Sequence, residues 1–156
     1  MRKRKIVIPQ KSSHSKNEQY EGAYVKEPIT GLHKWVVSFD LNSLYPHLIM
    51  QYNLSPETLL KSKHQAITVD DMLKGIKLDI PDKTTMTPNG ALFRTDKKGF
   101  LPTMMEELYN ERVTYKKKML SAQQEFENTN DNKYKKLISR YNNIQMAKKI
   151  SLNSAY

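Results

Sequence analysis

A carboxylate followed directly by a predicted helix start is the first group in this sequence that could do chemistry. Asp40 could ligate a hard cation such as Mg²⁺, with the carbonyl oxygen of Leu41 as a second ligand. The backbone amides of the helix start, those of Ser43, Leu44 and Tyr45, suit a phosphate group. Metal and phosphate would then lie side by side, as phosphoryl transfer requires. The residues alone leave open the simpler alternative, in which Asp40 only caps the helix.

Two further sets of polar side chains fall on two long predicted helices. Arg112 and Lys116 are four residues apart, so both cations share one helix face and could hold a triphosphate. Lys149, Asn153 and Tyr156 share a face in the same way. Basic pairs also occur on ordinary exposed faces, and the face of Lys149 could equally be a solvated one ending in a core tyrosine. The four histidines show no ligand spacing, and we assign them no role.

Asp40 and the residues after it should be positioned by a strand and a helix. Residues 35–39 are β-branched and aromatic, and they predict a buried strand that ends at Asp40. Residues 43–52 predict a helix with Pro46 in its first turn, where the missing N–H leaves no hydrogen bond unmade. Beyond it we predict a short helix over residues 69–75. A β-hairpin is expected over 85–95, turning at Pro88-Asn89-Gly90.

The C-terminal part predicts two long helices, over residues 102–128 and 133–155. Gly99 and Pro102 open the first helix, and apolar residues recur along both with a helical period. The polar run 128–132 separates them. Because this connection is short, the two helices should form an antiparallel hairpin.

Composition excludes several classes of protein. The chain has 156 residues, which suits one domain or a piece of a larger one. Its mean hydropathy is −0.73 and it has no run of 18 apolar residues, so a membrane span is not expected. It has no cysteine, which excludes disulfide scaffolds, thiolate zinc sites and cysteine nucleophiles. A reducing, cytoplasmic location is therefore expected.

The net charge of +10 is concentrated at the two ends of the chain. Residues 1–17 and 133–156 carry six basic residues each and no acidic one, whereas residues 18–132 hold 14 basic and 16 acidic residues. Two basic ends favour a polyanion as partner, with nucleic acid first. A solvated tail and a basic helix face account for the charge equally well.

Taken in order along the chain, these motifs resemble those of family B DNA polymerases. The motif called A corresponds to Asp40-Leu41-Asn42-Ser43-Leu44-Tyr45-Pro46, and the fingers pattern to Gly99-Phe100-Leu101-Pro102 followed by Arg112 and Lys116. Motif B corresponds to residues 149–156 and stops one residue short of its glycine. Tyr20-Glu21-Gly22-Ala23 is similar to the element between the exonuclease and polymerase parts, and Ser55-Pro56-Glu57-Thr58 also matches. The resemblance covers about residues 6–156 and is greatest to polymerases of tailed bacteriophages.

The resemblance implies a role for each matching residue. Asp40 would be a catalytic, metal-binding carboxylate beside the Leu41 carbonyl, in a two-metal Mg²⁺ site of which this chain holds half. Ser43, Leu44 and Tyr45 would hold the triphosphate through their amides, and the Tyr45 ring would exclude a 2′-hydroxyl. The other nucleotide-binding residues would be Arg112, Lys116, Lys149 and Asn153. The DNA-binding residues would be Tyr20, Gly22, Ala23 and Tyr156.

Two departures from the family pattern are visible. His47 stands where many members have serine, and only 33 residues separate Lys116 from Lys149, so the fingers hairpin is short. The second carboxylate motif of the family, Asp-Thr-Asp, does not occur in these 156 residues. Two-metal catalysis needs that second set. The chain is therefore expected to be inactive alone, as a split-gene product, an exon or intein-flanked piece, or part of a longer polymerase.

The resulting expectation is an α+β fold that is an incomplete domain. Residues 1–31 would form a basic linker, 32–98 a partial palm with strand, helix and small hairpin, and 99–156 an antiparallel two-helix fingers hairpin. Its partners would be primer-template DNA, a dNTP, and a second polypeptide or C-terminal part carrying Asp-Thr-Asp and the thumb, and no membrane. Two alternatives stay open: a non-catalytic basic DNA-binding module and a functionless relic.

Overall fold

The computed structural model describes residues 25–155, which belong to two compact units, Met1–Phe39 and Asp40–Tyr156. In the first unit, the described residues 25–39 contain neither helix nor strand, and all of them are exposed. The second unit contains four helices and three strands in its described part. The helices are α1 (Leu44–Gln51), α2 (Val69–Leu73), α3 (Phe100–Thr129) and α4 (Asn132–Asn153). The strands are β1 (Leu59–Lys63), β2 (Thr84–Met86) and β3 (Ala91–Arg94).

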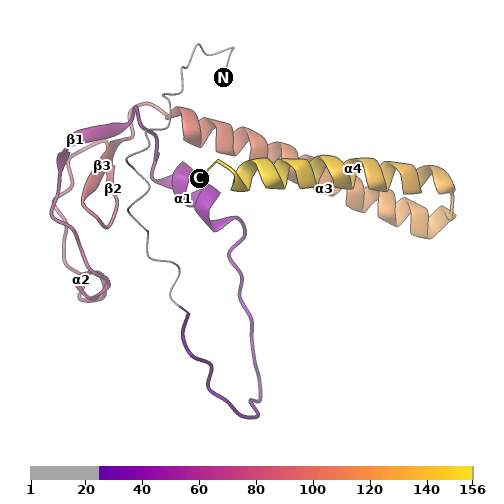
Figure 1. Ribbon diagram of the computed structural model, residues 1–156, viewed down its shortest axis with the longest axis horizontal. Coiled ribbons are helices and arrows are strands. Elements are labelled where there is room, and N and C mark those ends of the chain that lie inside the picture. The colour runs from indigo at the N-terminus through magenta and orange to yellow at the C-terminus, as the bar shows by residue number, and fades with distance from the viewer. Residues whose placement is uncertain (1–24, 156) are drawn as a thin grey trace, which may run out of the picture. The chain divides into compact units, whose positions relative to one another are not determined.

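The strands form one antiparallel sheet in the order β1-β3-β2 (Figure 1). The predicted hairpin is β2 and β3, with Thr85 opposite Phe93. Its turn is built by Asn89, whose side-chain oxygen accepts from the Thr87 hydroxyl at 2.7 Å and the Ala91 amide at 3.2 Å. Gly90 has φ 80°, in the left-handed region that favours glycine. The hairpin prediction is confirmed, and β1 is a strand that the sequence did not predict.

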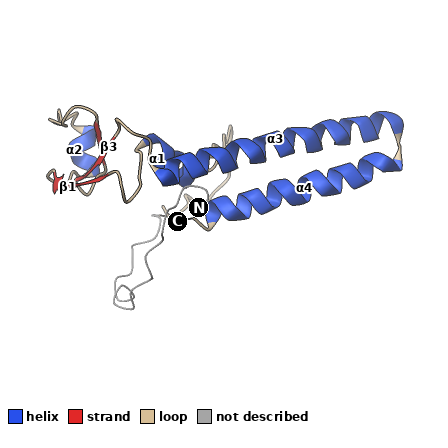
Figure 2. Ribbon diagram, turned by 90° about the horizontal axis from the view of Figure 1, so that it is seen from above, coloured by secondary structure: helices blue, strands red, loops and turns tan. Residues whose placement is uncertain are grey.

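The two predicted long helices are present and pack side by side as an antiparallel hairpin (Figures 1 and 2). Asn130 ends α3 in the left-handed conformation, and the Asp131 carboxylate then accepts from the Lys133 amide at 2.9 Å to cap α4. The predicted helix start near Ser43 is also correct, since α1 begins at Leu44 and buries Pro46 in its first turn. Together with the sheet, these helices confirm the α+β class.

The core of the second unit is small, and its buried apolar residues are divided between the sheet and the long helices. Its buried apolar residues are Met86, Ala91, Leu92, Met105, Ala122 and Leu152. Helix α1 packs against α3, and α3 packs along α4 (Figure 2). Within residues 25–155, no helix is both long and apolar enough to cross a membrane.

The strand predicted over residues 35–39 is wrong. These residues form no strand and are exposed, and Trp35 is 97% and Phe39 91% accessible. Trp35 also has a left-handed φ of 60°, which a strand does not allow. A strand exists only when a neighbour takes its backbone hydrogen bonds. The sheet of the described residues pairs β1, β3 and β2 with each other and offers residues 35–39 no partner. Asp40 therefore follows an exposed segment without regular structure and not a buried strand.

Candidate functional site

The start of α1 is held in an unusual conformation at Ser43. Its φ of 52° and ψ of 49° are left-handed, a region that costs a residue with a side chain roughly 1–2 kcal/mol. The Ser43 carbonyl accepts from the His47 amide at 3.1 Å and from its ring Nδ1 at 2.9 Å. The His47 ring also makes an edge contact with Tyr109 of α3, with ring centroids 4.8 Å apart. His47 thus holds the first turn of α1 against α3, a role that the sequence did not reveal.

Arg112 of α3 reaches the same helix start. Its Nη1 donates to the Ser43 hydroxyl at 3.2 Å, although the two residues are 69 positions apart in the chain. Its Nε is buried and has no hydrogen-bond partner among the described residues. Burying a donor without an acceptor costs about 1–3 kcal/mol, and more for a charged group. The structure therefore brings Ser43 and Arg112 together and leaves one guanidinium donor unsatisfied.

The predicted basic residues of α3 and α4 lie on either side of an ion pair that joins the two helices. Lys116 lies one turn beyond Arg112 on α3. Lys148 of α4 forms an ion pair with Glu111 of α3, which fixes how the helices are aligned. Because Lys149 follows Lys148 directly and Arg112 follows Glu111, both lie within about one helical turn of that ion pair along the helix axis. Asn153 is the last residue of α4, one turn beyond Lys149.

The residues proposed for the metal and the sugar are accessible. Asp40 is exposed, and Leu41 is 71% and Tyr45 56% accessible. Because the first amides of a helix have no acceptor within it, the Leu44 amide is directed out of the start of α1. Among the residues that the structure describes, no three His, Cys, Asp or Glu side chains cluster as a metal site would require. Asp40 and the Leu41 carbonyl are thus two candidate oxygen ligands and not a complete cation site.

Asn53 anchors the start of α3 to the segment after α1. Its side-chain amide donates to the carbonyls of Arg94 at 2.6 Å and Lys97 at 2.9 Å, and its oxygen accepts from the Gly99 amide at 2.8 Å. Asn53 is only 6% accessible. Its own φ of 54° is left-handed, a conformation that asparagine tolerates better than most residues. One buried side chain therefore joins α1, the end of β3 and the first residue before α3.

The segment Ser55–Thr58 caps α3 directly. The Glu57 carboxylate accepts from the Phe100 amide at 2.5 Å, and the Ser55 hydroxyl accepts from the Leu101 amide at 3.3 Å. These are first-turn amides, which no residue within the helix can satisfy. Burial raises the pKa of Glu57, but hydrogen bonds from the Ser55 hydroxyl and the Phe100 amide and the charge of Lys97 outweigh it, so the pKa lies below its ordinary value. An ionised Glu57 thus fixes the base of the helix that carries Arg112.

Gly99 is required where this cap is tightest. A Cβ atom added at Gly99 would lie 2.6 Å from the Cβ of Ser55 and 3.2 Å from the Thr58 methyl group. Thr58 is itself buried, and its hydroxyl donates to the Asn53 carbonyl at 2.6 Å. The sequence singled out Ser55–Thr58 as a family match without a role. The available signal was the residue types of this segment, because Ser, Glu and Thr around Pro56 are typical of turns and helix caps.

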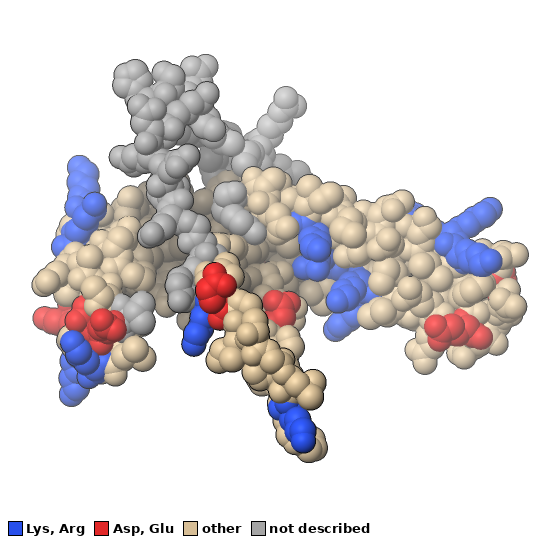
Figure 3. All heavy atoms as spheres, turned by 60° about the horizontal axis from the view of Figure 1, so that its bottom comes forward, with Lys and Arg blue, Asp and Glu red and all other residues tan. Residues whose placement is uncertain are grey.

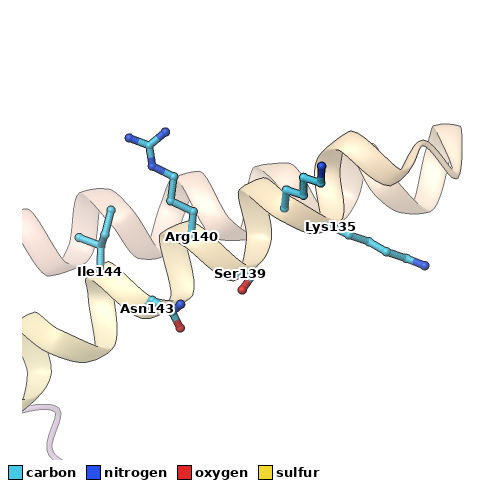
Figure 4. A pocket seen from close by; sticks show the side chains of 6 residues that line it. Lys135, Ser139, Arg140, Asn143 and Ile144 are labelled. Atoms are coloured by element: carbon cyan, nitrogen blue, oxygen red, sulfur yellow. The ribbon is translucent and has the colours of Figure 1, made fainter.

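Lys and Arg side chains recur along the surface of the helical hairpin (Figure 3). One open depression on α4 is lined by Lys135, Lys136, Ser139, Arg140, Asn143 and Ile144 (Figure 4). Lys135, Lys136 and Arg140 belong to the basic end 133–156, for which the sequence predicted a polyanion partner, but none of the six was predicted to bind the metal or the nucleotide. The depression is therefore separate from the Ser43–Arg112 site. Tyr20, Gly22, Ala23 and Tyr156, predicted to contact DNA, lie outside the described residues.

Comparison with known proteins identifies the family. The sequence model of DNA polymerase family B matches residues 1–156. The chain is 40% identical to the DNA-directed DNA polymerase of Escherichia phage RB69 and 33% identical to that of Enterobacteria phage T4, over 75% of its length in each case. It is 37% identical to the DNA polymerase delta catalytic subunit of Candida albicans over 97% of its length. The matching region spans 13% of each of these three relatives. The chain belongs to DNA polymerase family B.

Proposed function

We propose that the chain supplies the nucleotide-binding half of a DNA-directed DNA polymerase active site. The observation that carries this proposal is the Arg112 guanidinium, which donates to the Ser43 hydroxyl at 3.2 Å while its buried Nε has no partner among the described residues. A triphosphate oxygen is an acceptor of the right charge for the guanidinium group. The Leu44 amide at the start of α1 offers a second donor of the kind that phosphate groups use at helix N-termini.

In this proposal Lys116 and Lys149 neutralise the outer phosphates and Asn153 helps to position them. Lys149 follows Lys148, whose ion pair with Glu111 joins the two helices. Because the helices are antiparallel, Lys116 and Asn153 lie in opposite directions from that ion pair, each about 7 Å along the axis. A triphosphate held by all three would therefore extend along the hairpin. The Tyr45 ring, half of which is accessible, would lie under the sugar and exclude a 2′-hydroxyl. Fixed cations around a transferring phosphoryl group stabilise the charge that develops on it without reorganising at the moment of reaction.

Asp40 and the Leu41 carbonyl would hold Mg²⁺ together with phosphate oxygens and water. Two protein oxygens fit this cation, because Mg²⁺ in phosphoryl-transfer sites is typically held by one or two carboxylates plus substrate phosphates. When bound, the metal supplies Lewis-acid stabilisation of the phosphate oxygens. Asp40 is exposed and so can reach such a ligand. Its role is to hold the cation next to the amides of α1.

A second carboxylate set must come from other residues, those of a second polypeptide or of a further part of the same one. Asp-Thr-Asp is absent from these 156 residues, and the matching region spans only 13% of the phage relatives. The exposed residues 35–41 give such a part a surface to cover. Their exposed apolar side chains are Trp35, Val36, Val37, Phe39 and Leu41. A strand paired along them would form hydrogen bonds with their backbone N–H and C=O groups, and the rest of that part would cover these side chains.

The assignment of regions follows from the same proposal. Residues 1–31 would be a linker, 32–98 part of a palm and 99–156 the fingers, which close on the dNTP opposite primer-template DNA. Tyr20, Gly22, Ala23 and Tyr156 would contact that DNA. A cytoplasmic location, in the host cell if the protein is viral, belongs to this proposal too.

The experiment is a segment exchange in a complete polymerase. The 117 residues of the phage RB69 polymerase that align with this chain are replaced by those of this chain, and primer extension is measured with Mg²⁺. We expect synthesis by the chimaera and none by the purified 156-residue chain. Primer extension by the chain alone, free of contaminating polymerase, would refute the claim that the chain holds only half of an active site. A folded, DNA-binding chimaera that incorporates no nucleotide would instead favour a non-catalytic DNA-binding module.

A further inference from the structure

Helix α4 carries a second basic surface that the nucleotide site does not use. The helix contains six basic residues and no acidic one. Its side toward α3 is marked by buried Gln145 and Leu152 and by Tyr141, whose ring lies 6.2 Å from that of Tyr115. Basic residues on the other sides of α4 are therefore directed to solvent.

The basic residues of α4 fall on two different flanks. Arg140 and Lys149 are nine residues apart, which at about 100° per residue places them about 180° apart around the helix axis. Lys136, Arg140 and Asn143 follow an i, i+4, i+7 spacing and so share one face. Ser139 lies beside them and lines the same open depression. We call Lys136, Ser139, Arg140 and Asn143 the outer face of α4.

The two cations of the outer face, Lys136 and Arg140, form no ion pair or cation–π contact among the described residues. Lys133 pairs with Asp131 at 3.1 Å, and the Lys135 ammonium lies 5.1 Å from the centre of the Phe126 ring. Lys136 and Arg140, in contrast, are exposed and form no ion pair within the described part of the chain. In Figure 4 the Arg140 side chain extends away from the ribbon of α4. Two unpaired cations flanked by hydroxyl and amide groups match a row of phosphates.

We propose that the outer face of α4 binds the sugar–phosphate backbone of nucleic acid, apart from the nucleotide site. Charge complementarity argues for this partner, because the chain carries +10 and the whole of α4 lacks an acidic residue. The aromatic residues of α4, Tyr134 and Tyr141, are seven residues apart and share the side toward α3, so neither belongs to the outer face. Base stacking, which favours single strands, is therefore absent. Binding rests on phosphate contacts and does not depend on sequence or on strandedness.

The test compares two double variants of the full chain. Lys136→Gln/Arg140→Gln removes both outer-face cations, and Lys74→Gln/Lys77→Gln removes the same charge from exposed positions between α2 and β2. Each protein is titrated with a short labelled duplex of mixed sequence across a series of KCl concentrations. We expect the outer-face variant to bind several-fold more weakly than the control. The slope of log affinity against log salt should fall by about 1.8, since each lost duplex phosphate contact contributes about 0.9.

Additional measurements distinguish the outer face of α4 from the nucleotide site and from a surface for acidic proteins. A single strand should lose affinity in the same variant, and Lys149→Gln should weaken dNTP binding without changing the duplex salt slope. The proposal would be overturned if the two double variants had the same duplex affinity and the same salt slope. It would also be overturned if Lys149→Gln lowered the duplex salt slope as much as the outer-face variant does. If the outer-face variant loses poly-L-glutamate binding but keeps duplex binding, the face serves an acidic protein and the proposal is wrong. Retained helix content by circular dichroism is the control for folding.

Discussion

Ser43 and Arg112 meet across 69 positions of sequence at a hydrogen bond of 3.2 Å, which joins the strained start of α1 to the middle of α3. The contact holds the guanidinium beside the amides of the helix start. It also leaves the buried Nε of Arg112 without an acceptor among the described residues. A guanidinium next to helix-start amides offers the donors that a phosphate group uses, which supports the nucleotide site proposed above.

Two variants of Ser43 should distinguish the contribution of its hydroxyl group from that of its left-handed backbone conformation. Both Ser43→Ala and Ser43→Gly lose the contact to Arg112, so both should weaken dNTP binding to the chimaeric polymerase by a similar factor. Only Ser43→Ala keeps a side chain in the left-handed conformation. It should therefore be less stable than Ser43→Gly by about 1 kcal/mol in urea unfolding. Equal stabilities of the two variants would show that the left-handed conformation of Ser43 carries no strain.

The cap on α3 should make stability depend on pH. The pKa of Glu57 lies below its ordinary value of 4.5, so its ionised form stabilises the folded state. That contribution is complete above pH 4.5 and is lost as the pH falls through the lower pKa of the folded state. Glu57→Gln should therefore be less stable than wild type at pH 7, and the difference should shrink in acid. Asp79→Asn, at an exposed position, is the control. A difference that is constant with pH would exclude this role of Glu57.

Asn53 should matter more to stability than any exposed asparagine. Asn53→Ala removes three hydrogen bonds, leaves the amide of the buried Gly99 without its acceptor and places alanine in a left-handed conformation. We expect a loss of about 2–4 kcal/mol in the free energy of unfolding. Asn128→Ala on the exposed surface of α3 should change it by less than about 0.5 kcal/mol. Similar losses in the two variants would show that Asn53 does not anchor α3.

The proposed sugar contact of Tyr45 predicts a change in substrate choice. Tyr45→Ala in the chimaera should raise kcat/KM for a ribonucleotide relative to its deoxy counterpart, because a steric clash with the 2′-hydroxyl is removed. Tyr45→Phe keeps the ring and should keep the wild-type ratio. The measurement is the ratio of the two kcat/KM values in each protein. An unchanged ratio in Tyr45→Ala would remove Tyr45 from the sugar site.

Local signals in the sequence predicted the elements that depend on local structure. The helical period and the polar run after residue 128 predicted α3 and α4, and Pro88-Asn89-Gly90 predicted the turn between β2 and β3. Elements that depend on distant partners were not predicted. Strand β1 pairs with β3 some 30 residues later, as Leu59 lies opposite Phe93, and its own sequence shows no alternation. Residues 35–39 have the composition of a strand, but composition does not supply a neighbour.

The candidate site likewise combines residues that motif spacing selected with contacts that only the folded chain creates. Motif spacing selected Ser43 and Arg112, but their contact and the left-handed φ of Ser43 come from the packing of α1 on α3. Asn53 was missed because its three partners lie 41 to 46 residues away. His47 looked like a departure from the family pattern. Its ring instead joins the Ser43 carbonyl to Tyr109, a role that only the folded chain reveals.

The role of Asp40 is tested most directly by the rate of the chemical step in the chimaeric polymerase. Single-turnover incorporation of a correct dNTP is measured for the parent chimaera, for Asp40→Asn and for the exposed control Asp79→Asn, with DNA affinity measured in parallel. If Asp40 holds the catalytic cation, Asp40→Asn slows incorporation by roughly 10³-fold or more, as expected when several kcal/mol of metal-dependent stabilisation is lost. DNA affinity should barely change, and Asp79→Asn should match the parent. Incorporation by Asp40→Asn at the parent rate would contradict the assignment of this chain to a polymerase active site.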